Sequence, residues 1–246
     1  PWFSNPLKPD WIVCKLTEDL TSLVASTFLG GNDWDEGAYM VLSDDGSVYV
    51  SGTTNSLDFP HTADAYDTVN HGGTYGGDGF VSRLSPDLST LLNSTFLGGG
   101  ENDWIYAIAI DDTGHVFVAG HTPSPDFPTS DGCYSDRYNA ITGADVGDDG
   151  FVSAFNADLS ALLASTFLGT SGWENINGMS LREDGAVFVG GNTNSYAWPT
   201  TEGTWDEDFN GGNFQYGGDG FFACLDHNLT RLTASSYLGG SGQEVV

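Results

Sequence analysis

Basic side chains are nearly absent from this chain of 246 residues. It holds 6 Lys and Arg residues against 34 Asp and Glu residues, which gives a formal net charge of −28. Because such a surface repels phosphate groups, neither nucleic acids nor anionic membranes are expected as partners. The acidity suits either a saline environment or bound divalent cations, both of which relieve repulsion between carboxylates.

Cysteine is also scarce, and long apolar runs are missing. The cysteines are Cys14, Cys133 and Cys224, with no Cys-x-x-Cys pair and no Cys/His ligand spacing. We expect Cys14 and Cys224, which fall in corresponding β-type runs, to be buried thiols. No apolar run reaches the roughly 18 residues of a membrane-spanning helix, so direct membrane insertion is not expected. No segment shows a sustained 3.6-residue apolar period, which argues against a core helix.

The chain instead contains a repeated unit of about seventy residues. Ser-Thr-Phe-Leu-Gly occurs at Ser26–Gly30, Ser94–Gly98 and Ser165–Gly169, and a looser copy stands at Ser235–Gly239. Successive copies start 68, 71 and 70 residues apart. A fixed period indicates one supersecondary unit copied in tandem, so the fold depends on what one unit is.

Each unit contains four short β-type runs. In the second copy we expect strands at Ile105–Ile110, His115–His121, Phe151–Phe155 and Leu162–Leu168. The first two runs are separated by Asp-Asp-Thr-Gly, in which glycine supplies the positive φ of a tight hairpin. Four strands in each unit predict an all-β chain. Radial repetition of such sheets gives a β-propeller built from four-stranded blades, in which few strand edges stay unpaired.

The motifs also resemble those of a known repeat family. Ser-Thr-Phe-Leu-Gly-Gly, Asp-x-x-Gly-x-Val-Phe-Val-Ala-Gly-x-Thr, Asp-Phe-Pro-Thr and Asp-Gly-Phe-Val-Ser follow one another in this chain. This order is similar to that of the bacterial SBBP repeat family, named for a seven-bladed β-propeller. The resemblance covers nearly the whole chain and implies propeller blades, but it implies no particular activity. The chain departs from the family pattern where Trp34, Trp104 and Trp173 replace small or acidic residues.

The motif positions also predict where the units begin and end. We expect a half unit at about 1–31, complete units at about 32–99, 100–169 and 170–240, and the start of another at 241–246. Three blades and a half blade would leave an apolar face and a strand edge in water. We therefore expect either a segment of a longer polypeptide or a chain that partner chains complete.

Acidic loops form the first candidate site. The longest irregular segments join the second and third strands of each unit, at about 61–77, 129–148 and 200–218. Each ends in a glycine-rich turn where carboxylates and backbone carbonyls would suit calcium. The candidate ligands are Asp78, Asp148, Asp149 and Asp219. The alternative is that the aspartates only cap their turns through hydrogen bonds to their own backbone.

Tryptophans form the second candidate site. The candidate ligand-binding residues are Trp34, Trp104, Trp173, Trp198 and Trp205. Exposed indole rings beside Asp and Asn suit a platform for sugars. The first three recur at one position of the repeat, however, and that pattern equally predicts packing between blades. Phe59, Phe127 and Trp198, each followed by proline, are expected to be structural plugs.

Groupings typical of catalysis are missing from the sequence. His61, His71, His115, His121 and His227 occupy different places in the repeat and show no metal-ligand spacing, so each is expected to be a surface or turn residue. No Gly-x-Ser-x-Gly elbow or phosphate-binding loop is present. We therefore predict a non-catalytic, secreted or cell-surface β-propeller scaffold that contacts proteins or assembles with itself, for adhesion or for surface or filament assembly. The alternative is a carbohydrate-binding module or polysaccharide-acting enzyme.

Overall fold

The structure is a computed structural model that describes residues 8, 10–73, 77–140, 147–211 and 218–242. Within these residues every helix-or-strand element is a β-strand, numbered β1 to β14, so the all-β prediction is confirmed. No helix capable of crossing a membrane is found in this part of the chain. Parts of the predicted terminal units, at 1–7, 9 and 243–246, lie outside the described residues.

The strands form one two-stranded sheet and three four-stranded antiparallel sheets among the described residues. The N-terminal pair is β1 (Trp11–Leu16) and β2 (Leu23–Leu29). Sheet I contains β3 (Asp35–Leu42), β4 (Val48–Thr54), β5 (Asp78–Leu84) and β6 (Leu91–Leu97). Sheet II contains β7 (Trp104–Ile110), β8 (Val116–Thr122), β9 (Asp149–Phe155) and β10 (Leu162–Leu168). Sheet III contains β11 (Glu174–Leu181), β12 (Val187–Thr193), β13 (Asp219–Leu225) and β14 (Leu232–Leu238).

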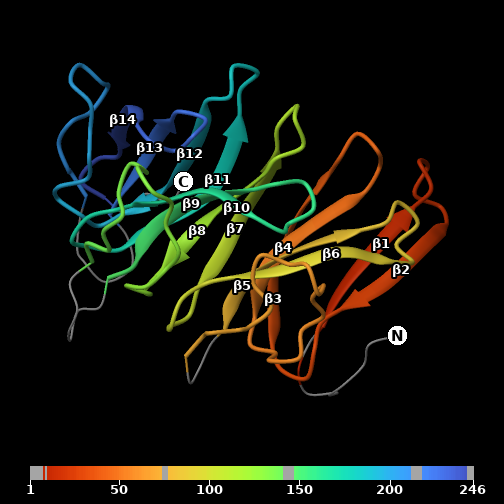
Figure 1. The fold of residues 1–246 in the computed structure, drawn as a ribbon. Coiled ribbons are helices and arrows are strands. Elements are labelled where there is room, and N and C mark those ends of the chain that lie inside the picture. Colours follow the sequence, from red (N-terminus) through yellow and green to blue (C-terminus); the bar gives the residue numbers. More distant parts are fainter. Residues whose placement is uncertain (1–7, 9, 74–76, 141–146, 212–217, 243–246) are drawn as a thin grey trace.

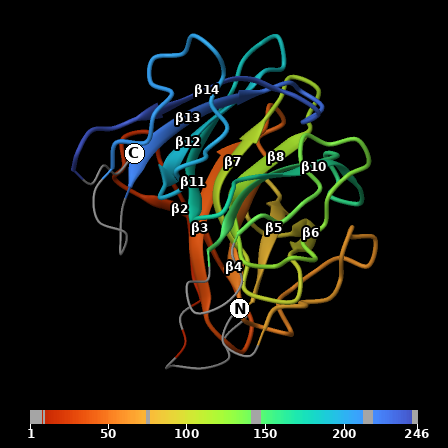
Figure 2. The ribbon, with the colours of Figure 1, turned by 90° about the vertical axis from the view of Figure 1, so that its left-hand side faces the viewer.

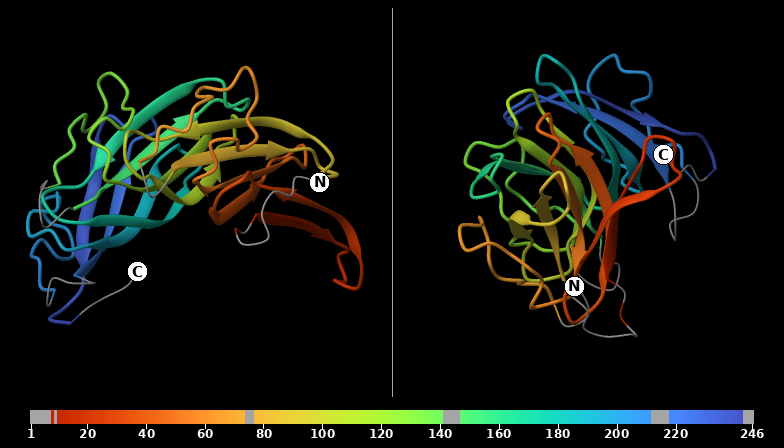
Figure 3. Two further views of the ribbon diagram at one scale, coloured as in Figure 1. Left: turned by 90° about the horizontal axis from the view of Figure 1, so that it is seen from below. Right: turned by 90° about the vertical axis from the view of Figure 1, so that its right-hand side faces the viewer.

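The sheets stand face to face in chain order (Figure 1). β7 contacts both β3 and β11, so the first strands of sheets I, II and III lie together. Seen from below, the sheets follow an arc with the N-terminal pair at one end and sheet III at the other (Figure 3). Figure 2 looks onto the sheet III end. Three apolar clusters fill the spaces between consecutive sheets, so each sheet is stabilised by its neighbours.

Two kinds of turn recur in the sheets. Gly46, Gly114 and Gly185 close the hairpins between first and second strands with φ of 80°, 88° and 85°, as the sequence predicts. Between third and fourth strands the corresponding residue is a leucine with positive φ, Leu159 (57°) in sheet II and Leu229 (57°) in sheet III. Both leucine side chains are buried, which offsets a backbone cost of about 1–3 kcal/mol.

Those leucine turns also receive the long loop of the preceding sheet. The Tyr66 amide in the sheet I loop donates to the Leu159 carbonyl at 2.9 Å. The Tyr134 amide in the sheet II loop donates to the Leu229 carbonyl at 2.8 Å. The long loops of sheets I and II therefore each hold the sheet that follows them along the chain.

The residues before proline are buried plugs, as predicted. Each ring packs on the phenylalanine that is the third residue of the third strand. The pairs are Phe59 with Phe80 (4.3 Å between ring centroids), Phe127 with Phe151 (4.4 Å) and Trp198 with Phe221 (3.9 Å). The indole of Trp198 also donates from Nε1 to Ser235 Oγ at 2.8 Å, so this larger plug satisfies its polar atom inside the core.

The predicted burial of both strand cysteines is correct only for Cys224. Cys14 is exposed, and no disulfide joins either residue to Cys133. Cys14 lies on β1 in the outermost two-stranded sheet, whereas Cys224 lies on β13 within a four-stranded sheet. Cys224 therefore has a neighbouring strand on both sides, whereas Cys14 has one on one side only, and a strand pattern alone does not reveal this.

Candidate functional site

Three of the predicted calcium ligands begin the third strand of their sheets. Asp78, Asp149 and Asp219 are fully buried. In each case Oδ2 accepts a hydrogen bond at 2.7 Å from a backbone amide in the preceding long loop. The donors are His71, Asn139 and Asn210, respectively. These aspartates therefore fix the ends of the long loops, through partners seven to ten residues back rather than within their own turn.

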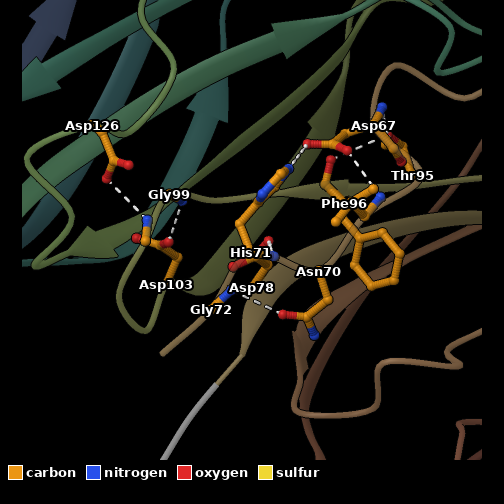
Figure 4. Close-up of polar contacts among 12 residues, drawn as sticks. Asp67, Asn70, His71, Gly72, Asp78, Thr95, Phe96, Gly99, Asp103 and Asp126 are labelled. Carbon is orange, nitrogen blue, oxygen red and sulfur yellow. Dashed lines mark hydrogen bonds and ion pairs between the residues drawn. The ribbon is translucent and has the colours of Figure 1, made fainter. Parts of the chain in front are cut away.

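A second buried carboxyl from the next sheet faces Asp78 and Asp149. Asp103, just before β7, accepts hydrogen bonds on Oδ2 from the Gly99 amide (2.7 Å) and Ser124 Oγ (3.0 Å). Figure 4 shows Asp103 bound to the Gly99 amide and Asp78 beside His71. A Cβ on Gly98 would lie 2.5 Å from Asp78 Oδ1 and 2.6 Å from Asp103 Oδ2. Only glycine fits between the two carboxyls.

Burial and the charges of neighbouring carboxylates raise the pKa of both Asp78 and Asp103. Burial raises the pKa of Asp78 to about 8, and the charge of Asp103 adds to this effect. Burial likewise raises the pKa of Asp103 to about 7. At pH 7 Asp78 is therefore mainly a neutral acid, which avoids placing two negative charges in one buried site.

The same pairing recurs along the arc. Asp149 and Glu174 both lie against Gly169, whose Cβ would stand 2.6 Å from Asp149 Oδ1 and 2.7 Å from Glu174 Oε2. Burial raises the pKa of Asp149 to about 7, with the charge of Glu174 contributing. Between the N-terminal pair and sheet I, burial raises the pKa of Asp35 to about 6, with Asp10 contributing. Asp78 and Asp149 are candidates from the sequence, whereas their partners Asp103 and Glu174 are not, and neither member of the Asp10 and Asp35 pair is.

The loop above the Asp78 pair is held by a small polar network (Figure 4). The Asp67 carbonyl accepts from the Phe96 amide at 3.1 Å, and the Asp67 amide donates to Thr95 Oγ1 at 2.9 Å. His71 Nε2 lies 3.2 Å from Asp67 Oδ2. The glycine-rich tips at 74–76, 141–146 and 212–217, which include parts of the predicted acidic turns, lie outside the described residues. Calcium binding by these loops stays a prediction.

Asp148 differs from the other three candidates because it belongs to an aromatic cluster. Its Oδ2 accepts the indole N–H of Trp173 at 2.8 Å and lies 3.4 Å from His121 Nε2. The His121 ring stacks on Trp104 with 4.7 Å between centroids and is 6.0 Å from Trp173. Three predicted site residues thus meet around a histidine that sequence reasoning treated as a turn or surface residue.

The geometry of this cluster favours packing over catalysis. Burial lowers the pKa of His121, and the neighbouring Asp148 carboxylate opposes this shift. Its Nδ1 lies 3.2 Å from Asn175 Oδ1, while its Nε2 faces Asp148. Both ring nitrogens thus face protein groups, and the residue is buried. The strand position of His121 beside a recurring tryptophan is the signal that could have identified the cluster.

The remaining tryptophans, Trp34, Trp198 and Trp205, differ in how far they are exposed to solvent. Trp198 is a buried plug, so its ring is not available as a sugar platform. Trp34, just before β3, is partly exposed, and its carbonyl accepts the Asn55 amide at 2.8 Å. Trp205 is 89% exposed in the sheet III loop. The structure therefore does not gather the five predicted residues into one surface.

Comparison with known proteins gives a limited result. No family model matches the chain, and no curated protein matches it. A similar solved structure is the crystal structure of a GH43_12 retrieved from capybara gut metagenome, with a TM-score of 0.43 and 8% sequence identity. The match covers 94% of this chain and 39% of that chain, so this chain spans about two fifths of its length. A likeness at this level carries no argument about activity.

Proposed function

We propose that this protein is a non-catalytic, secreted or cell-surface β-propeller scaffold that assembles through the end faces of its sheets. One observation carries the proposal. Residues at the same repeat position are buried inside the arc and exposed at its ends. The exposed residues correspond to part of each side of the interfaces that already join the sheets.

The first end face lies on sheet III. Phe188 on β12 is 40% exposed, whereas its counterparts Tyr49 and Phe117 in sheets I and II are buried. Phe222 on β13 is 52% exposed, whereas Val81 and Val152 at the same position are fully buried. In sheets I and II the next sheet covers these positions. We call the surface formed by Phe188 and Phe222 the sheet III face.

The second end face is the first strand of sheet I, which the N-terminal pair at that end of the arc leaves uncovered. Met40 and Leu42 on β3 are 66% and 68% exposed. Their counterparts in sheet II, Ile108 and Ile110, pack against the cluster that contains Tyr49 and Val81. The N-terminal pair lies over sheet I but contains only two strands, so the first strand of sheet I is left uncovered.

The two end faces are therefore complementary. In the sheet I to sheet II interface, residues of the Tyr49 type from one sheet pack with residues of the Ile108 type from the next. Sheet III presents the first type and sheet I presents the second. A second copy of this chain is the occupant that supplies both, through a head-to-tail contact that forms a ring or a filament.

Sedimentation velocity over a range of protein concentrations tests this proposal. We expect concentration-dependent association of the wild-type chain. Phe188→Thr combined with Phe222→Thr, which keeps strand-forming residues on the exposed face, should weaken association at least tenfold. Leu57→Thr is the matched control, because Leu57 is 80% exposed in a loop away from the sheet III face. A wild-type chain that stays monomeric, or a double variant that associates like the wild type, would contradict the proposal.

Carbohydrate binding is a second candidate, favoured by Trp205 alone. Its ring is exposed and is followed by three acidic residues, Asp206, Glu207 and Asp208. An indole face beside carboxylates suits a sugar ring and its hydroxyls. This candidate needs only one loop and does not depend on the end faces.

A further inference from the structure

Two histidines and an aspartate meet where sheet II faces sheet III. Asp111 and His115 flank the hairpin turn between β7 and β8. His227 belongs to the turn between β13 and β14 of the next sheet. Their ligand-type atoms all lie within 4.8 Å of one another. The sequence shows no metal-ligand spacing because the group is assembled from two units.

The Asp111 carboxylate is held with one oxygen toward the protein and one toward the histidines. Oδ1 accepts hydrogen bonds from the Thr113 amide (2.9 Å), Thr113 Oγ1 (2.7 Å) and the His115 amide (2.8 Å). Oδ2 lies 3.1 Å from His115 Nδ1 and 3.7 Å from His227 Nε2. The Asp111 side chain is only 10% exposed. Its orientation is therefore fixed before any ligand arrives.

The His227 ring is held from the other side. A Cβ on Gly185 would stand 3.0 Å from His227 Nδ1, so this glycine lets the imidazole lie against the β11–β12 turn. The buried ring of Phe117 lies 5.5 Å from the imidazole, measured between centroids. These contacts direct Nε2 toward Asp111. His115 Nδ1 has one further neighbour, Thr113 Oγ1, at 3.0 Å.

The equivalent positions between sheets I and II lack ligands. Ser43 stands where sheet II has Asp111, and Ser47 stands where it has His115. Ala157 occupies the position of His227. Asp111, His115 and His227 thus differ from the equivalent residues of the repeat, and all three lie where sheet II meets sheet III. Packing of the repeat does not require them, because the preceding junction forms without them.

An acidic cleft lies beside the three residues. It has a volume of about 330 Å³, and its walls include Asp112, Glu183, Asp184 and Arg182 besides Asp111 and His227. The guanidinium of Arg182 is paired with Asp184, with Nε to Oδ1 at 2.7 Å and Nη2 to Oδ2 at 2.5 Å. His115 and His227 are 34% and 38% exposed. A cation therefore has both access and a negative surrounding.

We propose that Asp111, His115 and His227 bind a divalent transition metal, of which zinc is the best match. Imidazole nitrogen and carboxylate oxygen are zinc ligands, whereas calcium takes oxygen ligands. Two ligands about 2.0–2.1 Å from a tetrahedral zinc stand about 3.3 Å apart. The distances from Asp111 Oδ2 to His115 Nδ1 (3.1 Å) and to His227 Nε2 (3.7 Å) lie on either side of this value. Three protein ligands leave the fourth position to water or to a group entering from the cleft.

Bound metal would join sheet II to sheet III directly. Two ligands come from one sheet and one from the next, so the ion stabilises the contact between them. This role does not rest on the proposed scaffold function. The site would act as a clamp in the chain itself, whatever the end faces bind.

Titration calorimetry with zinc chloride, with thermal melting in parallel, tests the site on the full chain. We expect one zinc ion per chain and a melting temperature that rises with zinc. His227→Ala and Asp111→Asn should each lower the zinc affinity at least tenfold and remove the rise in melting temperature. Circular dichroism without metal checks that each variant folds, and Asp111→Asn keeps a side-chain oxygen that can accept from Thr113.

His71→Ala is the matched control. His71 also lies beside an aspartate, with 3.2 Å from Nε2 to Asp67 Oδ2, but the described residues place no second imidazole with that pair. This variant should bind zinc as the wild type does. The proposal is overturned if the wild-type chain shows no saturable zinc binding, or if His227→Ala and Asp111→Asn bind zinc as tightly as His71→Ala.

Discussion

Phe117 on β8 and Phe188 on β12 occupy the same position in their sheets, opposite the third strand, yet Phe117 is 1% exposed and Phe188 is 40% exposed. Phe117 is covered by sheet III and packs near His227. Phe188 instead lies on the exposed face of sheet III, where Arg182 lies over its ring at 5.3 Å. Because the two residues share a repeat position and differ in burial, comparing them measures the effect of burial on stability.

We predict that Phe117→Ala lowers the free energy of unfolding by about 3–5 kcal/mol, because it removes a fully buried ring. Phe188→Ala should lower it by about 1 kcal/mol or less, since part of that ring is already in water. Urea denaturation at dilute protein concentration measures both values. If the two variants lost equal free energy of unfolding, the Phe188 ring would be as buried as the Phe117 ring, which would contradict an exposed sheet III face.

Stability should decrease as pH rises from about 4 to 8. The folded pKa of Asp78 is about 8, whereas its ordinary value is 3.8, so over this range the folded state keeps a proton that the unfolded chain has released. Its contribution is complete below pH 4 and is lost as pH approaches 8. Asp103 and Asp149, each raised to about 7, act in the same direction. Melting temperatures at pH 5 and pH 8 check this trend.

Asp78→Asn assigns part of that trend to a single residue. The side-chain oxygen of asparagine can still accept a hydrogen bond from the His71 amide, but asparagine has no proton to release over this pH range. The slope of unfolding free energy against pH should therefore become shallower by up to about 1.4 kcal/mol per pH unit. Asp87→Asn is the control: hydrogen bonds from Ser85 and Ser89 lower the pKa of Asp87 to about 2, so the slope above pH 5 should not change. An unchanged slope in Asp78→Asn would refute the neutral-acid assignment.

Trp198 and Trp205 should respond oppositely in stability and in binding assays. Trp198→Ala removes a buried ring and a hydrogen bond to Ser235, and we expect a loss of about 3–5 kcal/mol in unfolding free energy. Trp205→Ala should leave stability within about 0.5 kcal/mol, because its ring is in solvent. On a glycan array we expect no signal from the wild-type chain. A signal that folded Trp205→Ala loses would favour the carbohydrate-binding candidate over the scaffold.

Local features of the fold are largely readable from sequence. The Ser-Thr-Phe-Leu-Gly copies end the fourth strands, and Gly46, Gly114 and Gly185 close the predicted hairpins. The plugs before proline are also correct, because each is repeated with its phenylalanine partner. These features depend on residues close together in the chain, where spacing and turn chemistry decide the structure.

The specific polar contacts between residues of different sheets were not predicted. Asp103 and Glu174 were not recognised as partners of Asp78 and Asp149, because their contact depends on two sheets closing around a glycine. His227 was interpreted as a turn residue, although the next sheet's turn lies beside Asp111. The exposure of Cys14 likewise depends on its place in the outermost pair. Pairwise contacts across units are not visible in a repeat pattern that describes one unit.

The bonds from Tyr66 to Leu159 and from Tyr134 to Leu229 give the array a direction. In both cases the loop binds the sheet that follows it in the chain, and not the sheet that precedes it. Shortened versions made by deleting units from the amino-terminal side would keep the remaining anchors, whereas deletion from the carboxyl-terminal side would release the Tyr134 loop. An engineer who wishes to vary the length of this protein should therefore remove repeats from its front.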